Sequence, residues 1–261
     1  MDDNSWSTIK WVSNHNLGSN YWSVGATKKI VMNGKVSDGL TLTNFETYVY
    51  ILGFNHNETL EGSGIVFGGF KTAQTGGNDI ALIDKGYGTG TATSGQHFNM
   101  NNSNTSAGGW QSSLMRTVNI PLIKAAFPSD LQTVIKTSTI YTDNVGGGSG
   151  DVESNVTATQ DDIYLLSEYE VFGTRKYANT YEASKQQQYA YYSAGNSKIK
   201  LIHDTNISSA ATVSYWWERS PASSFSTEIE GSGLWFCLVQ NDFASLGSVY
   251  SLEAVAPAFR V

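Results

Sequence analysis

Short runs of apolar and β-branched residues, separated by small polar residues, occur along most of the chain. Residues 47–54 (Thr-Tyr-Val-Tyr-Ile-Leu-Gly-Phe) have no regular polar alternate, which predicts a strand buried on both faces at the centre of a sheet. Residues 8–12 alternate between polar and apolar positions and predict a short strand. Residues 29–36 predict two short strands about an Asn33-Gly34 turn, because Asn-Gly favours tight hairpin turns.

Helical and loop signals complete the pattern. Ser112-Ser113 can cap a helix over residues 114–126, which Pro121 can divide. Residues 86–109 are mostly Gly, Thr, Ser and Asn and predict a long surface excursion, a feature that is usually functional or mobile. The glycine-rich residues 146–150 predict a loop rather than a domain linker, since neither flank resembles a self-sufficient domain. Together these signals favour many short strands joined by glycine turns over a helical bundle.

Charge is scarce and narrows the classes of partner. Charged residues make up 15% of the 261 residues, against roughly a quarter in an average soluble protein. The net charge is -7, and the longest basic run is the pair Lys28-Lys29, so nucleic acid is not an expected partner. The apolar run at residues 234–239 is far shorter than the ~20 residues that span a bilayer, and no signal peptide is visible at the N-terminus. We therefore expect no membrane insertion.

Candidate chemistry is sparse. The lone Cys237 excludes an internal disulfide and the zinc patterns that need two thiolates. The nucleophile elbow, the phosphate-binding loop, the dinucleotide-binding glycine motif and the zinc-protease motif do not occur. His56, with Glu58 nearby, is the best-placed histidine, and we interpret it as structural because two ligands do not make a metal site. Residues 143–144 and 161–162 offer oxygen ligands for Ca²⁺, but such ligands are common in so polar a chain. We expect no metal and no cofactor.

The C-terminal third holds the most informative segment. The adjacent residues Trp216, Trp217, Glu218 and Arg219 predict a buried scaffold anchor, with an ion pair or backbone contacts fixing the following loop. The end of the chain, with Pro257 and Phe259, predicts a final strand that closes the sheet. Within residues 232–252, the first half predicts a core strand and the second half a loop. Large apolar side chains in that loop are either buried or form an exposed contact patch.

The pieces that carry a resemblance to a known family are residues 20–25, 51–57, 69–73, 108–110, 141–144, 170–173, 191–198 and 216–221. Through them the chain resembles a family of uncharacterised domains common in phage and prophage proteins of gut bacteria. The Trp-Trp-Glu-Arg-Ser-Pro anchor, the Phe-Cys-x-Val strand and the terminal Ala-Pro-Ala-Phe also resemble variable proteins of diversity-generating retroelements.

This resemblance implies an α+β, C-type lectin-like fold, with short antiparallel strands, one or two helices and long loop insertions, in a single domain over residues 1–261. It also implies a variable region at about residues 222–254, where adenine-directed mutagenesis rewrites codons. Mutated Asn codons can encode Leu, Phe, Ser, Gly and Tyr, whereas Trp235, Gln240 and Glu253 cannot arise in that way. The candidate variable, ligand-binding positions are Leu234, Leu238, Asn241, Phe243, Ser245, Leu246, Gly247, Ser248, Tyr250 and Leu252.

The function implied is recognition of a protein or cell-surface receptor, not enzymatic turnover, with the protein on a phage virion tail or a bacterial cell surface. One alternative is an oxidase related to formylglycine-generating enzymes, against which a single cysteine in an apolar strand argues. A second alternative is an invariant structural protein of a virion or cell surface. Calcium-dependent sugar binding through residues 240–242 and Glu253 is a weaker variant of receptor recognition.

Overall fold

The centre of the fold is the pairing of two long strands, β1 (Thr27–Ser37) and β2 (Leu40–Phe54). The computed structural model describes residues 1–88, 90–204, 206, 213–223 and 232–261. As the sequence predicted, residues 47–54 form an inner strand, because β2 lies between β1 and β3 (Ile65–Lys71). The side chains of Val49, Tyr50, Ile51 and Leu52 are buried, so both faces of this part of the sheet are covered.

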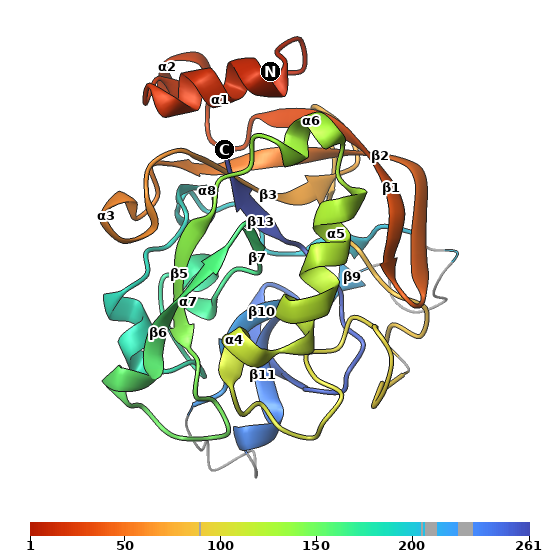
Figure 1. The fold of residues 1–261 in the computed structure, drawn as a ribbon, viewed down its shortest axis with the longest axis vertical. Helices are drawn as coiled ribbons and strands as arrows, with labels where there is room; N and C mark the ends of the chain where they lie inside the picture. The colour runs from red at the N-terminus through yellow and green to blue at the C-terminus, as the bar shows by residue number, and fades with distance from the viewer. Residues whose placement is uncertain (89, 205, 207–212, 224–231) are drawn as a thin grey trace.

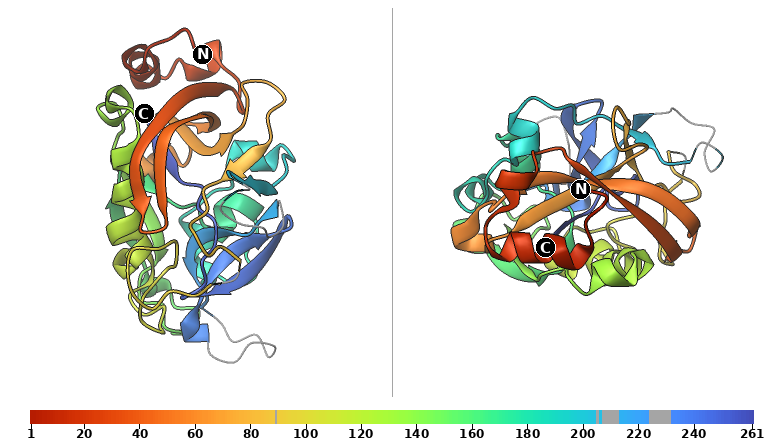
Figure 2. Two further views of the ribbon diagram at one scale, coloured as in Figure 1. Left: turned by 90° about the vertical axis from the view of Figure 1, so that its right-hand side faces the viewer. Right: turned by 90° about the horizontal axis from the view of Figure 1, so that it is seen from above.

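The main sheet curls around this centre and is mostly antiparallel (Figures 1 and 2). Its order in the described residues is β1-β2-β3-β4-β8-β9, and only the β4–β8 pair is parallel. The C-terminal strand β13 pairs with β3 and with β7, which confirms the prediction that the end of the chain closes the sheet. The strands not yet bounded are β4 (Asp79–Ala81), β7 (Ile163–Tyr164), β8 (Lys200–Ile202), β9 (Val213–Ser214) and β13 (Ala258–Arg260).

The described residues also form two smaller antiparallel sheets. One is the pair β5 (Ser138–Asp143) and β6 (Val156–Asp161). The other has the order β10-β11-β12 and is built from β10 (Trp216–Pro221), β11 (Trp235–Gln240) and β12 (Phe243–Ser248). This last sheet contains the predicted anchor in its first strand and most of the candidate variable positions in the other two.

Helices are short, so the chain is a mixed α+β protein dominated by sheet. Figure 1 shows α1 and α2 at the end of the molecule that holds the N-terminus, and α5 packs against β1 and β7. The α-helices are α1 (Trp6–Asn14), α2 (Gly18–Tyr21), α3 (Glu58–Glu61), α4 (Gly109–Ser112), α5 (Ile120–Ala126), α6 (Ser129–Gln132), α7 (Glu168–Phe172) and α8 (Ala190–Ser193). The other helical turns are η1 (Met115–Asn119), η2 (Glu153–Asn155), η3 (Thr180–Ser184) and η4 (Ser232–Leu234).

Three local predictions were wrong. Residues 8–12 lie in α1, because Trp6, Ile9 and Val12 recur at helical spacing on one buried face and Ser5 caps the first turn. Residues 29–36 lie within the single strand β1, where the register shift between Met32 and Gly34 is a bulge and not a turn.

The third wrong prediction is the loop after β11, where the structure has strand β12. Asn241 and Asp242 both adopt left-handed backbone angles, with φ values of 49° and 72°. Two such residues form the tight turn that joins antiparallel strands, and both residue types tolerate this conformation. The C-terminal segment is therefore a hairpin of β11 and β12.

The long polar excursion supports this hairpin. Within its described part, Phe98 and Met100 are fully buried, and the Met100 N–H donates to the carbonyl of Val249. The predicted helix over residues 114–126 is divided as its proline suggested, into the π-helical turn η1 and then α5, with Pro121 in the first turn of α5. No helix in the described part of the chain is long and apolar enough to cross a membrane.

Candidate functional site

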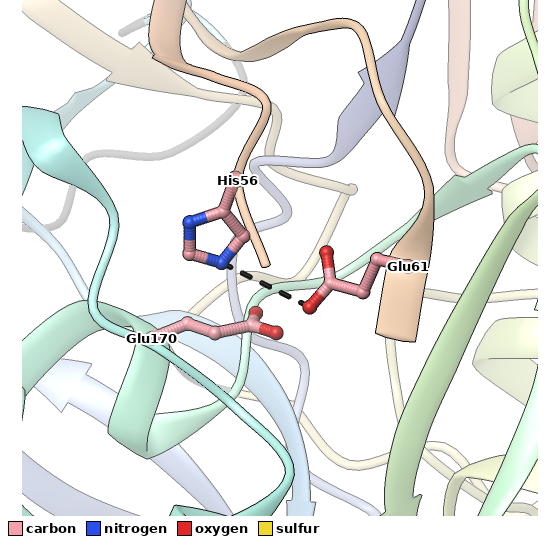
Figure 3. Close-up of side chains that lie close together, drawn as sticks. All are labelled: His56, Glu61 and Glu170. Carbon is pink, nitrogen blue, oxygen red and sulfur yellow. Dashed lines mark ion pairs between the residues drawn. The ribbon is translucent and has the colours of Figure 1, made fainter. Parts of the chain in front are cut away.

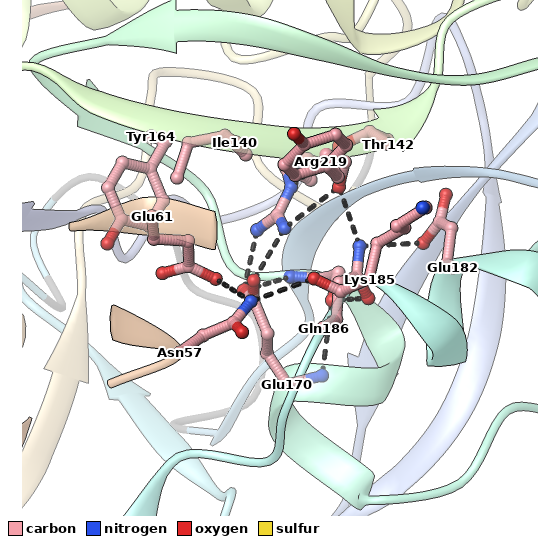
Figure 4. A network of polar contacts seen from close by, with 12 residues as sticks. Asn57, Glu61, Ile140, Thr142, Tyr164, Glu170, Glu182, Lys185, Gln186 and Arg219 are labelled. Atoms are coloured by element: carbon pink, nitrogen blue, oxygen red, sulfur yellow. Dashed lines mark hydrogen bonds and ion pairs between the residues drawn. The ribbon is translucent and has the colours of Figure 1, made fainter. Parts of the chain in front are cut away.

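Arg219 lies at the centre of a buried polar network that joins β10 to the rest of the protein (Figure 4). Its guanidinium makes a bidentate ion pair with Glu170, at 2.6 Å from Nη1 and 2.5 Å from Nη2. The remaining donors contact the hydroxyl of Thr142 and the carbonyls of Tyr141 and Leu165. These contacts give the guanidinium hydrogen-bond partners in place of water, which a buried charged group requires.

The sequence around Glu170 positions its carboxylate for the ion pair with Arg219. Ser167 and Glu170 form a capping box at the start of α7, in which each side chain binds the other residue's backbone N–H. This fixes the carboxylate at the helix N-terminus, facing Arg219. Burial alone would lower the pKa of the Arg219 guanidinium, but the Glu170 carboxylate outweighs it and holds this pKa above its ordinary value.

A second buried cluster adjoins the first and draws its side chains from three segments (Figure 3). His56 Nε2 lies 3.9 Å from Glu61 Oε1, and Glu170 completes a group whose candidate ligand atoms all lie within 4.8 Å of one another. Burial lowers the pKa of His56 to about 4, so its imidazole is neutral at pH 7. Burial also raises the pKa of the Glu61 carboxyl. Glu58, the carboxylate that the sequence placed beside His56, is exposed instead.

The hydrogen bonds of this cluster indicate a structural tie and not an open metal site. Glu61 Oε1 accepts from the Asn57 amide, and Glu61 Oε2 accepts from Arg260 at 2.9 Å. Both oxygens of Glu170 accept from Arg219. Arg219 and Arg260 already bring two positive charges to this group, and a divalent cation would add more. The cluster connects α3, α7, β10 and β13.

Glu218 and Cys237 are buried without such partners. In the described structure, neither carboxylate oxygen of Glu218 has a hydrogen-bond partner, and burial raises its pKa well above the usual range. Glu218 and Arg219 do not pair with each other, because neighbouring residues of a strand point to opposite faces. The backbone contacts that the sequence offered as the alternative do form, from Arg219 to the carbonyls of Tyr141 and Leu165. Burial likewise raises the pKa of the Cys237 thiol, which disfavours the reactive thiolate. All four predicted anchor residues are fully buried.

The oxygen ligands that the sequence offered to calcium are held by protein donors. Asp161 accepts from Trp110 and Arg116, and Asp162 from Lys124 and Thr137. These groups border a surface hollow of about 450 Å³ beside α5. Asp143 accepts from the backbone of residues 145–146 and from Asn179. At the hairpin, Gln240 accepts from Ser245, and Asp242 accepts from the Lys198 N–H.

The hairpin of β11 and β12 places most candidate variable positions near the surface. Phe243 is 73% exposed beside the turn, and Asn241 is exposed within it. The positions that are half-buried are Leu234, Ser245, Leu246, Ser248 and Tyr250. Residues 224–231 of the implied variable region lie outside the described residues. We define the hairpin surface as Asn241, Phe243, Ser245, Leu246, Ser248 and Tyr250.

Three candidate positions are buried and cannot contact a ligand in this conformation. Leu238 is 2% exposed in the central strand of its sheet, and Leu252 is 6% exposed. A Cβ atom on Gly247 would lie 2.5 Å from the Trp217 ring and 2.7 Å from Leu238, so only glycine fits. These positions hold residue types that mutated Asn codons can encode. Residue type carries no information about which side of a strand a residue faces.

One comparison shows the family to which the chain belongs. Residues 78–261, which include all of β10 to β13, match the family described as "Domain of unknown function (DUF6273)", so the chain belongs to this family. No curated protein and no solved structure matches the chain.

Sequence reasoning missed Glu61, Glu170 and Arg260. The Ser-x-x-Glu pattern at residues 167–170 is a capping-box signal that could have placed Glu170 at a helix start. Nothing local indicates that Arg219, 49 residues further along, is its partner.

Proposed function

We propose that this protein is a recognition protein that binds a protein or cell-surface receptor through the hairpin surface. The observation that carries the proposal is Phe243, a large apolar side chain that is 73% exposed at the tip of a hairpin. Exposed aromatic groups on a rigid base provide contact area at a low entropic cost, and the small polar side chains around them adapt their hydrogen bonds. Ser245, two residues from Phe243 on the same face of β12, supplies such a polar group.

The base of the hairpin supports a display function. All six residues of β10, which pairs with β11 of the hairpin, are buried, and Arg219 links β10 to β5 and α7. A scaffold held by satisfied buried charges does not depend on the side chains of the outer strand. Substitutions at the exposed Asn241 and Phe243 are therefore expected to change the free energy of unfolding by less than about 0.5 kcal/mol.

We further propose that the scaffold is C-type lectin-like and that a retroelement diversifies the hairpin surface in a phage or prophage protein. Supporting this, the six residues of the hairpin surface are of types that mutated Asn codons encode. The protein would be carried on a virion tail or a bacterial cell surface. The buried Cys237 thiol gives no support to an oxidase function, and turnover of a thiol peptide that Cys237→Ser abolishes would argue against the proposal.

The experiment is to sequence this gene and its flanking DNA from many isolates. We expect substitutions to concentrate at codons 241, 243, 245, 246, 248 and 250, and to be rare at codons 238, 247 and 252. A near-copy of the last ~100 bases and a reverse transcriptase gene should lie nearby. Substitutions scattered evenly along the chain, with no flanking near-copy, would favour an invariant structural protein instead.

A further inference from the structure

A surface hollow of about 390 Å³ lies between β4 and the segment that joins α8 to β8, away from the hairpin surface. We call it the β4–α8 hollow. Its volume is within the range of roughly 300–1,000 Å³ that small-molecule sites have. The lining residues that bear on its chemistry are Asn78, Asp79, Tyr191, Asn196, Ser197 and Ile199.

Asp79 is the charged residue at the wall of the hollow, and its neighbours hold its carboxylate in place. Lys71 forms an ion pair with its Oδ1 atom, and Lys200 Nζ lies 3.6 Å from Oδ2. The hydroxyls of Tyr50 and Tyr191 donate to Oδ2 at 3.0 and 3.2 Å. Burial raises the pKa of Asp79, but the two lysines and Tyr50 outweigh it and hold this pKa below its ordinary value, so the carboxylate is ionised.

This carboxylate can accept a further hydrogen bond from a ligand. Its two oxygens offer about four acceptor positions, of which the bonds from Lys71, Tyr50 and Tyr191 use only part. The Asp79 side chain is 9% exposed and lines the hollow. A charged ligand is disfavoured, since the carboxylate repels an anion and the ammonium groups of Lys71 and Lys200 behind it repel a cation. The hollow therefore selects an uncharged hydrogen-bond donor.

The other polar side chains of the hollow are uncharged, and each can both donate and accept. The Asn196 amide donates to the carbonyl of Tyr191 at 2.7 Å, which orients it and leaves its oxygen and one N–H for a ligand. Ser197 Oγ accepts from the Ile199 N–H at 3.1 Å, so its own O–H can donate. The exposed Asn78 adds a second amide. Ile199, which is 38% exposed, adds an apolar surface beside these groups.

We propose that the β4–α8 hollow binds a neutral sugar residue of a glycan. The hydroxyl groups around a pyranose ring both donate and accept, which matches the two amides, the Ser197 hydroxyl and the Asp79 carboxylate. The C–H groups of the ring match the apolar side chain of Ile199. Because two ammonium groups already hold Asp79, binding needs no calcium ion. None of the lining residues belongs to the hairpin surface, so a sugar can bind here whether or not that surface recognises a receptor.

The hollow is tied to the hairpin turn although it shares no residue with the hairpin surface. The Lys198 N–H donates to Asp242 Oδ1 at 2.6 Å, which joins the segment that lines the hollow to the turn between β11 and β12. Residues 77–79 and 191–201 lie outside the implied variable region at residues 222–254. A glycan that extends from the hollow to Phe243 would therefore contact a constant sugar site beside a variable surface.

The test measures binding of methyl glycosides to the full chain by saturation-transfer NMR, with EDTA present to remove calcium. The panel contains neutral hexosides, N-acetylhexosaminides and deoxyhexosides, together with uronic acids. A methyl hexoside has ~13 non-hydrogen atoms, and the affinity per atom that is typical of small ligands gives a Kd of about 1 mM. We expect at least one neutral glycoside to bind with this strength.

Matched variants test whether the sugar lies in the hollow. Ser197→Trp fills the hollow and should abolish binding. Asn78→Ala, on a different segment, removes one amide and should weaken binding about fivefold. Two control variants should leave the Kd unchanged: Asn20→Ala, which removes an exposed amide on α2, and Phe243→Ala, which changes the hairpin surface.

Several results would overturn the sugar site in the hollow. These are the absence of binding by any neutral glycoside at about 10 mM, binding of the uronic acids alone, and binding that neither Ser197→Trp nor Asn78→Ala weakens. If Phe243→Ala abolishes sugar binding while Ser197→Trp does not, the sugar lies on the hairpin surface. That result would support recognition by the hairpin and exclude the hollow as the sugar site.

Discussion

The two outer strands of the β10-β11-β12 sheet are opposite in character although β11 alone separates them. All six residues of β10 are buried. The guanidinium of its Arg219 donates hydrogen bonds to residues outside β10. β12 carries no charge, and its first residue, Phe243, is 73% exposed. One edge of the sheet is closed by buried ions and the other is open to solvent.

This difference shows how a small sheet can be both rigid and variable. A buried charge tolerates no change in its partners, because any loss leaves an uncompensated ion in a medium of low dielectric constant. An exposed strand of small and apolar residues loses little when a side chain changes. Changes in β10 and in β12 should therefore have very different effects on stability.

The largest effect is expected from Arg219→Met. Removing the guanidinium leaves Glu170 charged and fully buried, which costs about 3–5 kcal/mol. Urea unfolding at pH 7 measures this loss. Lys29→Met is the matched control, because its pair with Glu46 is exposed and its loss should be much smaller than that of the buried pair. Similar losses in the two variants would show that the Arg219 network does not hold β10.

A smaller loss is expected where β12 contacts the anchor. In Gly247→Val the new side chain meets the Trp217 ring and Leu238, and overpacking of this kind costs about 1–3 kcal/mol. Ser245→Val, on the same face two residues away, should change stability by less than about 0.5 kcal/mol. Thermal unfolding of both variants measures these changes in stability. If Gly247→Val is as stable as the unchanged protein, Gly247 is again a candidate variable position.

The buried Glu218 of β10 should make the stability of the protein depend on pH. Burial raises the pKa of Glu218 well above 4.5, so the native state retains a proton that the unfolded chain releases. Stability should therefore fall as the pH rises above about 4.5, the ordinary value for glutamate. In Glu218→Gln this fall should be shallower, which urea unfolding between pH 5 and pH 8 would reveal. Parallel curves for the two proteins would mean that Glu218 is ionised when buried.

The smallest effect on stability is expected from Phe243→Ala. Its side chain loses little burial on truncation, so the free energy of unfolding should change by less than about 0.5 kcal/mol. Phe236→Ala, in the buried strand β11, should cost about 3–5 kcal/mol. A loss above 1 kcal/mol in Phe243→Ala, measured by urea unfolding, would mean that Phe243 is part of the core and would argue against display.

Local sequence patterns predicted those elements whose burial depends on their own composition. The inner strand at residues 47–54 is a nearly continuous apolar segment, and the closing strand at residues 258–260 continues the apolar run 254–259. Both lie where they were expected. The helix at residues 6–14 was missed because five residues fit both a strand and a helical period. β12 was missed because its side chains are small and its turn uses Asn-Asp.

The sequence by itself determined that the chain is a sheet-rich α+β protein, with a buried anchor at Trp216 to Arg219 and a core strand after it. Only the tertiary structure decided that Arg219 pairs with Glu170, that Gly247 faces Trp217, and that Phe243 faces solvent. The physical reason is the distance along the sequence between the residues that interact. Strand and turn preferences come from neighbouring residues, whereas ion pairs and the exposure of a strand face depend on elements that are distant in sequence.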